Sequence, residues 1–299
     1  MNASLSLLQS VLPASVGLRV KIPEAHPSAQ ILGTDRMGSG MLVDPAGIIL
    51  TVNYVGLGAE TVDVTLLDET RLAGQVIAQD FYTGLSAVKI PGGDYPSVTA
   101  GSSTGLAIGQ EVFLLASAGG SQRRVNNGGI TSLGPFDAFW EFRLERAIIT
   151  TAMNPGLGGG GLFNSAGALV GVVSLDLNEI GRFTLGIPAE HWFAHRDELL
   201  REGRRTSRPA RAWVGFYCYA LREHVVVAGV LPGTPGERGG LRPGDVIVSI
   251  DDHEIATRAD LYAQLWTHRP GEAVRFHVFR DDSVRLITVE STDAETFFA

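Results

Sequence analysis

Histidine serves both proton transfer near neutral pH and metal ligation, and the chain has seven histidines. His26 alone lies in the first half; the others are His191, His195, His224, His253, His268 and His277. His191 and His195 are four residues apart, which places them on one face of a helix, but no third ligand stands at a spacing typical of zinc sites. We therefore predict no metal site and no cofactor, and solvent-exposed positions for the six C-terminal histidines.

Hydroxyl and thiol groups are the candidates for covalent chemistry. The single cysteine, Cys218, excludes an intrachain disulfide, and it lies in the apolar run Phe216–Ala220, where a free thiol packs as a small hydrophobe. Ser165 follows the glycine-rich segment Met153–Asn164. No histidine lies near that serine in the sequence, so any pairing between them would depend on the fold.

The composition of this chain limits the classes of partner that it can bind. It has 299 residues with a net charge of −8, which offers no broad basic surface for nucleic acid or for an anionic membrane. No run approaches the roughly 18 apolar residues of a membrane span. The N-terminus lacks a positively charged leader, since its first basic residue is Arg19. We expect a cytoplasmic protein if the chain is complete, and a periplasmic or secreted one if a leader has been removed.

The elements that would position these residues differ between the two parts of the chain. Residues 38–188 read as short alternating strands joined by glycine turns, with a loop-like stretch from Gly119 to Gly129. A helix follows from Pro188 to Leu200, and then the basic stretch Arg201–Arg211 reads as an exposed linker. We expect a mainly β protein with domains at 1–200 and 212–294, joined by residues 201–211.

The second part shows one helix framed by strands. Thr257 and Asp260 form a pattern typical of a helix capping box, ahead of Leu261 and Leu265 on one helical face. The final hairpin turns at Asp281 and Asp282, between two alternating strands.

Several motifs together resemble the HtrA/Deg group of trypsin-like serine proteases with a C-terminal PDZ domain. Gly38–Asp44 and Ile49–Val55 are similar to the family's Gly-Ser-Gly strand and its Leu-Thr-Asn-His-Val segment. Asp80–Ile90 resembles the segment around the catalytic aspartate, and Met153–Asn164 resembles the nucleophile loop Asn-Pro-Gly-Asn-Ser-Gly-Gly-Pro-Leu. Gly240–Asp245 resembles the Gly-Leu-Arg-Pro-Gly-Asp turn of the PDZ domain. The resemblance implies a trypsin-like double β-barrel followed by a PDZ domain.

Peptide binding is what the PDZ resemblance implies. Such domains hold a peptide C-terminus with backbone N–H groups of one loop while the peptide adds as a strand beside a helix. The resemblance places these roles on Trp213, Val214, Gly215, Phe216, Leu261 and Leu265. The family also implies assembly as a homo-trimer or together with an active homologue.

The resemblance places the catalytic histidine, aspartate and serine at Tyr54, Gly84 and Gly158. Acyl transfer needs a nucleophilic hydroxyl, an imidazole and an orienting carboxylate, and none of the three residues supplies its group. The oxyanion-hole-like loop, Gly156, Leu157 and Gly158, continues into a run of four glycines, which predicts little intrinsic order.

We therefore predict that the chain is not an enzyme but a catalytically inactive HtrA-like homologue, or pseudoprotease. In this interpretation it acts as a peptide-binding or protein-binding scaffold, or as a regulatory subunit. The alternative is an active serine endopeptidase whose catalytic residues are relocated, with Ser165 as one candidate, or are supplied by a partner subunit.

Overall fold

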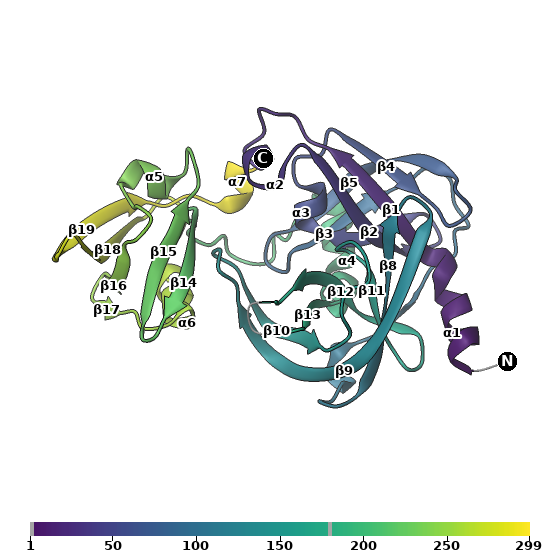
Figure 1. Ribbon diagram of the computed structural model, residues 1–299. Coiled ribbons are helices and arrows are strands. Elements are labelled where there is room, and N and C mark those ends of the chain that lie inside the picture. The colour runs from purple at the N-terminus through teal and green to yellow at the C-terminus, as the bar shows by residue number, and fades with distance from the viewer. Residues whose placement is uncertain (1–2, 179–180) are drawn as a thin grey trace. The chain divides into compact units, whose positions relative to one another are not determined.

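The computed structural model describes residues 3–178 and 181–299, which form two compact units (Figure 1). The first unit runs to Pro135 and resumes from Glu145 to Thr206. The second comprises Phe136–Leu144 together with Ser207–Ala299. A short segment from the middle of the chain thus belongs to the C-terminal unit, beside the division near residue 206. In the described residues, no helix combines the length and the apolar character needed to cross a membrane.

The first unit begins with a closed barrel in the strand order β1-β2-β3-β6-β5-β4. Alternating apolar side chains, such as those of Val16, Leu18 and Val20 in β1, point inward and are buried. The hairpin between β2 and β3 turns at Gly47, whose φ of 91° suits glycine. The strands are β1 (Ser15–Lys21), β2 (Asp35–Asp44), β3 (Ile48–Val52), β4 (Thr61–Thr65), β5 (Arg71–Asp80) and β6 (Leu85–Lys89).

A second sheet in the same unit has the order β11-β8-β9-β10-β13-β12-β7, and a pairing of β11 with β12 closes six of these strands into a ring. The strands are β7 (Thr99–Ala100), β8 (Glu111–Gly119), β9 (Gln122–Asp137), β10 (Arg143–Thr150), β11 (Gly161–Asn164), β12 (Ala168–Asp176) and β13 (Thr184–Pro188). The loop predicted from Gly119 to Gly129 is wrong beyond its first residues, because β8 turns at Gly119 and Gly120 and pairs with β9. The sequence shows no apolar alternation for this strand, because almost all β9 side chains are at least partly exposed to solvent and many are polar.

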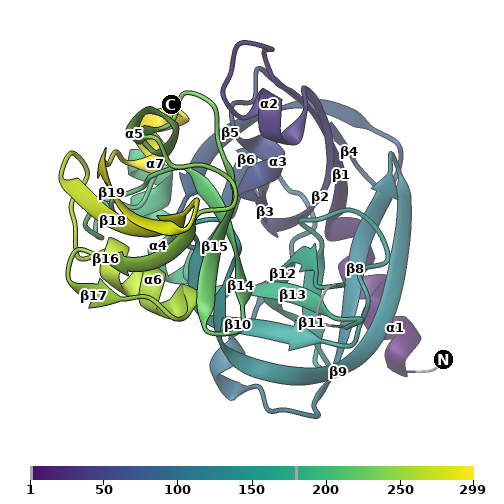
Figure 2. The ribbon, with the colours of Figure 1, turned by 60° about the vertical axis from the view of Figure 1, so that its left-hand side comes forward.

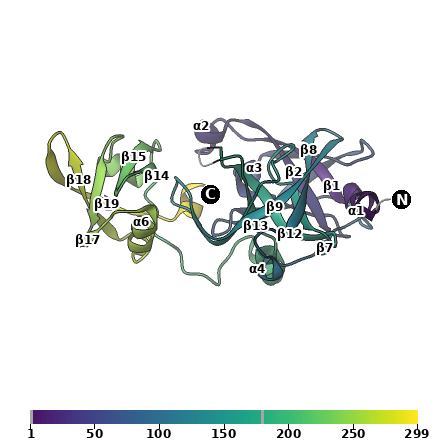
Figure 3. The same cartoon turned by 60° about the horizontal axis from the view of Figure 1, so that its bottom comes forward.

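The helices of this unit are α1 (Ala3–Val11), α2 (Ala29–Leu32), α3 (Asn53–Gly56) and α4 (Glu190–Glu202), the last of which lies below the strands in Figure 3. Helix α4 confirms the predicted helix, shifted by two residues, and it ends at Gly203, which is left-handed at φ 71°. The stretch after it is not uniformly exposed. Arg205 is 5% exposed, and its guanidinium lies 3.5 Å from the Asp80 carboxylate, so this arginine anchors the chain to the barrel.

The second unit is a sheet in the order β14-β15-β16-β18-β19, with β17 paired to β16 (Figure 2). Its strands are β14 (Phe216–Leu221), β15 (His224–Val230), β16 (Val246–Ile250), β17 (His253–Glu254), β18 (Ala273–Arg280) and β19 (Ser283–Glu290). Its helices are α5 (Pro235–Gly239), α6 (Arg258–Leu265) and α7 (Ala294–Phe297).

Three local predictions for this unit are confirmed. Thr257 and Asp260 form a complete capping box at the start of α6. Asp281 and Asp282 take φ values of 50° and 60° in the turn between β18 and β19, a conformation that aspartate tolerates better than most residues. Cys218 packs in the core at 1% exposure, as predicted, and burial raises the pKa of its thiol to about 11. The mainly β fold class is confirmed as well.

Candidate functional site

The three positions that the sequence singled out meet around helix α3. The Tyr54 hydroxyl donates a hydrogen bond to the Ser174 carbonyl at 3.0 Å. A Cβ atom added to Gly158 would lie well under 3.0 Å from that same hydroxyl oxygen. The Gly84 carbonyl accepts a hydrogen bond at 2.8 Å from the backbone N–H of Asn53, the residue before Tyr54. The phenol therefore fills the space beside Gly158.

Tyr54 is a proton donor in this site. Burial raises the pKa of its phenol to about 12, against the smaller lowering effect of its hydrogen bond to Ser174. The hydroxyl is therefore protonated throughout the physiological range and donates to a carbonyl. A general base would instead need a free lone pair and a pKa near 7.

Backbone hydrogen bonds join the glycine-rich loop to neighbouring strands. The Gly158 carbonyl accepts a hydrogen bond from the Ser39 N–H, and the Gly159 N–H donates to the Val173 carbonyl, both at 2.7 Å. Gly159 has a φ of 95°, and a Cβ there would collide with the Ser39 carbonyl. Neighbouring backbone crowds Gly159 and Gly160, whereas a Cβ at Gly158 or Gly161 would collide with a side chain.

Two N–H groups of the predicted oxyanion-hole-like loop are directed into the protein. The Leu157 N–H donates to the Ser117 carbonyl at 2.8 Å, and the Gly156 N–H donates to the Asn154 side-chain oxygen at 3.2 Å. An oxyanion hole needs donors aimed at a reacting atom. The loop as it stands uses these donors to hold its own shape.

A serine and a histidine do approach each other elsewhere in the first unit. The Ser28 Oγ lies 2.7 Å from the His26 Nδ1 and 3.0 Å from the Leu57 carbonyl, and it accepts a hydrogen bond from the Arg36 guanidinium at 2.7 Å. Ser28 is fully buried, whereas His26 is partly exposed. Ser165, the candidate from the sequence, is exposed in the turn between β11 and β12.

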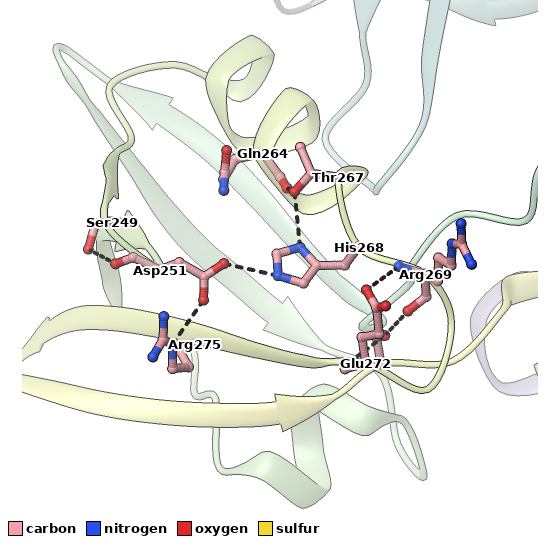
Figure 4. Close-up of polar contacts among 9 residues, drawn as sticks. Ser249, Asp251, Gln264, Thr267, His268, Arg269, Glu272 and Arg275 are labelled. Atoms are coloured by element: carbon pink, nitrogen blue, oxygen red, sulfur yellow. Dashed lines mark hydrogen bonds and ion pairs between the residues drawn. The ribbon is translucent and has the colours of Figure 1, made fainter.

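A threonine, a histidine and an aspartate also line up in the second unit (Figure 4). The His268 Nε2 lies 2.9 Å from the Asp251 carboxylate, and its Nδ1 lies 3.3 Å from the Thr267 Oγ1. The Thr267 hydroxyl donates to the Gln264 carbonyl at 2.7 Å, so its proton is committed to the end of helix α6. Asp251 also accepts from Arg275 at 3.0 Å. The cluster joins the end of α6 to the sheet.

The histidines divide by exposure. His224 and His253 are exposed as predicted, whereas His191, His195, His268 and His277 are partly buried. His195 faces Glu198 at 3.9 Å. Among the described residues, no group of three or more histidine, cysteine, aspartate or glutamate side chains could hold a metal ion.

The loop predicted to bind a carboxylate does contact one, and that carboxylate belongs to Glu141. The Val214 N–H donates to the Glu141 Oε1 at 2.7 Å. The Gly215 and Phe216 N–H groups donate to its Oε2 at 2.6 and 3.1 Å. Burial raises the pKa of Glu141 to about 7, although the three backbone hydrogen bonds act to lower it.

The residues before Glu141 run along β14, the terminal strand of the sheet. Trp140 forms an antiparallel bridge with Tyr217, and the Cys218 N–H donates to the Phe139 carbonyl at 2.7 Å. The Tyr262 hydroxyl of α6 donates to the Ala138 carbonyl at 2.6 Å. We call the loop Trp213–Phe216 and strand β14 together the ligand edge.

The other residues predicted to bind peptide include Leu261, Leu265 and Trp213, which pack against side chains of the protein itself. Leu261 and Leu265 are completely buried in the core of the second unit. Trp213 is partly exposed and packs against Phe297 and Phe298, with ring centroids 4.9 and 5.6 Å away. Their role in peptide binding stays a prediction.

Sequence reasoning missed Glu141 because nothing local marks a side chain that bonds to a loop more than 70 residues away. The aromatic residues on both sides of it were the available signal, since Phe139, Trp140 and Phe142 stand close together in an otherwise polar stretch.

Comparison with known proteins agrees with this architecture. Residues 38–172 match the family model of the trypsin-like peptidase domain, and residues 206–290 match that of the PDZ domain. A probable periplasmic serine endoprotease DegP-like from Pseudomonas savastanoi pv. phaseolicola is 30% identical over 301 residues, covering 95% of this chain and 61% of that protein. A protein of the same name from Ectopseudomonas mendocina is 29% identical, covering 88% and 58%. The chain thus spans about three fifths of these relatives.

Solved structures also match along nearly the whole chain. The HtrA-type protease AlgW with tripeptide matches with a TM-score of 0.59 and 27% identity, covering 96% of each chain. AlgW with decapeptide matches with a TM-score of 0.57 and 26% identity, covering 98% of this chain and 99% of that one.

These names correct one prediction. From Tyr54, Gly84 and Gly158 we expected a chain that is not an enzyme, but the relatives that match most of its length are named serine endoproteases. The prediction is wrong in assigning the chain outside that enzyme class. With both domain models matched in order and homologues along nearly the whole chain, this protein belongs to the HtrA/DegP-like trypsin-like peptidases that carry a PDZ domain.

Proposed function

We propose that this protein binds polypeptides as extended strands at the ligand edge, holding a carboxylate with the loop Trp213–Phe216. The single observation that carries the proposal is the convergence of the Val214, Gly215 and Phe216 N–H groups on one carboxylate. Strand addition to a sheet edge together with a loop that binds a carboxylate is the recognition mode of PDZ domains.

The similar proteins support this proposal. Two of the matching AlgW structures are described as complexes with a tripeptide and with a decapeptide. The named relatives are periplasmic, so we propose a periplasmic location for this protein rather than a cytoplasmic one. Scaffolding of bound polypeptides, or regulation of a homologous subunit within a homo-trimer or a mixed assembly, would be the use of such binding.

Isothermal titration against a library of peptides with free C-termini tests the proposal. The best peptide should lose at least about tenfold in affinity when its C-terminus is amidated, because the three N–H donors then lose a charged acceptor. Equal affinity for the free and amidated forms, or absence of binding across the library by a folded protein, would remove the proposal.

The second candidate is an endopeptidase whose catalytic groups lie outside positions 54, 84 and 158. The contact between Ser28 and His26 favours it, since a hydroxyl within hydrogen-bonding reach of an imidazole is the core of a nucleophile and base pair. The burial of Ser28 means that substrate access would require a rearrangement of α2.

Hydrolysis of unfolded casein by the purified protein distinguishes this second candidate. Ser28→Ala should abolish the activity while Ser165→Ala retains it, and the reverse result would assign the reaction to the exposed serine. Absence of casein hydrolysis by the purified protein would remove both serine assignments.

A further inference from the structure

The ligand edge is covered by the chain itself. We propose that Ala138–Glu141 is a built-in ligand of this edge, an internal competitor that an external peptide must displace before it can bind. The inference rests on the proposed function of the ligand edge and adds how access to it is controlled. We call Ala138–Glu141 the internal ligand.

The first support is the carboxylate. Both Glu141 carboxylate oxygens accept hydrogen bonds from the loop, at 2.6 to 3.1 Å, and the side chain is only partly exposed. Each N–H group has a single hydrogen to donate, so a peptide C-terminus cannot use these three donors while Glu141 holds them. The site is therefore occupied in the ground state.

The second support is the backbone. The internal ligand runs antiparallel to β14 through the Trp140 bridge to Tyr217 and the Cys218 hydrogen bond to Phe139. Its first residue, Ala138, is 1% exposed and accepts the hydrogen bond from Tyr262. The segment thus combines pairing with an edge strand and a carboxylate held by backbone N–H groups, two modes by which peptides are recognised.

The third support is the shape of the segment. The Ala138 N–H donates to the Phe142 carbonyl at 2.9 Å, and Arg143 pairs with Asp137 at 3.1 Å, so the two ends of the segment are joined. A turn closed in this way presents Glu141 with little loss of chain entropy. Because the internal ligand is tethered, its effective concentration at the edge is on the order of millimolar or above.

Because the internal ligand must first be displaced, an external peptide binds with a lower apparent affinity than it has for the open edge. The difference depends on the fraction of molecules in which the edge is open. A peptide that binds only the open form shows a dissociation constant raised by the reciprocal of that fraction. Removing Glu141 should raise the open fraction and tighten binding without changing the edge itself.

The experiment uses the full chain and a probe copied from it, the peptide spanning 134–144, N-acetylated, C-amidated and labelled with fluorescein. Fluorescence anisotropy should show binding to Glu141→Ala at least about tenfold tighter than to the unchanged chain. Glu145→Ala removes an exposed glutamate four residues after Glu141. It should bind the probe with the same affinity as the unchanged chain. A probe with alanine in place of its glutamate, which offers no acceptor to the three N–H groups, should bind neither.

Equal probe affinity for the unchanged chain and for Glu141→Ala would overturn the inference while leaving peptide binding intact. Hydrogen exchange at the Val214, Gly215 and Phe216 amides gives a second readout that needs no probe. These amides should be protected in the unchanged chain and exchange at least about tenfold faster in Glu141→Ala, with Glu141→Ser, whose side chain is too short to reach them, as the variant if alanine impairs folding. Unchanged protection would overturn the inference alone, whereas failure of the C-terminal peptide library against both chains would overturn the proposed function and, with it, the competition that the inference describes.

Discussion

Tyr54 and Gly158 pack against each other, and the Tyr54 hydroxyl occupies the space that a side chain at position 158 would need. The phenol reaches across to the Ser174 carbonyl and passes through the space that a side chain at position 158 would need. Interiors are packed densely enough that such a collision forces ring or backbone to move. The identity of one residue therefore limits what the other can be.

Gly158→Ala should destabilise the protein by about 1–3 kcal/mol, because the new Cβ collides with the Tyr54 hydroxyl. Urea denaturation followed by circular dichroism measures the loss. In a Tyr54→Ala background the same substitution should cost less, since the colliding ring is gone. Additive losses in the double variant would show that the collision is relieved some other way.

Glu141 links binding at the ligand edge to pH. Its pKa is about 7 when docked against an ordinary value of 4.5, so between these values the docked form holds more protons than the released form. Docking is therefore strongest below about pH 4.5 and weakens as pH rises towards 7. The titratable groups that interact with it are Cys218 and Tyr262, and burial raises the pKa of both, away from this range.

We therefore expect a pH effect on the affinity of the 134–144 probe for the unchanged chain, expressed relative to its affinity for Glu141→Gln. This relative affinity should increase between pH 5.5 and pH 8, because Glu141 docks less strongly as the pH rises. That variant has no titrating group at position 141 and should show only the pH dependence of the probe itself. Parallel pH profiles for the two chains would contradict the assignment.

At the scale of elements, Arg205 joins the segment after α4 to the end of β5. Its guanidinium approaches Asp80, which is 2% exposed and also accepts from the Tyr82 N–H and the Thr83 hydroxyl. A buried carboxylate that loses its cation is costly, while these two remaining donors offset part of the loss.

Arg205→Ala should therefore destabilise the first unit by about 3 kcal/mol, at the low end of the range for broken buried pairs. Thermal unfolding measures the effect. Arg204→Ala, a change to the exposed neighbour, should stay within about 0.5 kcal/mol. Similar losses in both variants would mean that Arg205 acts through general charge and not through Asp80.

Elements with local signals could be predicted from the sequence. The capping box of α6, the aspartate turn before β19 and the apolar alternation of the first barrel depend on residues within a few positions of one another. Strand β9 could not, because its side chains are polar and its place is fixed by pairing with β8. Arg205 and Glu141 could not either, since each finds its partner across more than 70 residues.

The same contrast holds for the candidate site. Positions 54, 84 and 158 could be placed together from motif order, and the structure does bring them around α3. Their residue types led to the prediction of a chain that is not an enzyme, which the names of its relatives contradict.

At the scale of the whole molecule, one chain supplies both a peptide-binding edge and a segment that fits it. A saturating C-terminal peptide should release the internal ligand from β14 and free its backbone at Phe139, Trp140 and Phe142 for cleavage by chymotrypsin. Limited proteolysis with mass spectrometry should show cleavage at these residues several times faster with peptide than without. The amidated peptide serves as control, and equal cleavage rates with both peptides would argue against displacement.

The second compact unit borrows nine residues, Phe136–Leu144, from far upstream in the chain. A truncated protein that starts at Ser207 would lack Glu141. Its Val214, Gly215 and Phe216 amides would then have no internal carboxylate to bind. Screens on such a fragment would rank peptides by their affinity for an unguarded surface and would overstate how readily the intact molecule takes them up. Any ligand found that way needs to be weighed again against the complete chain.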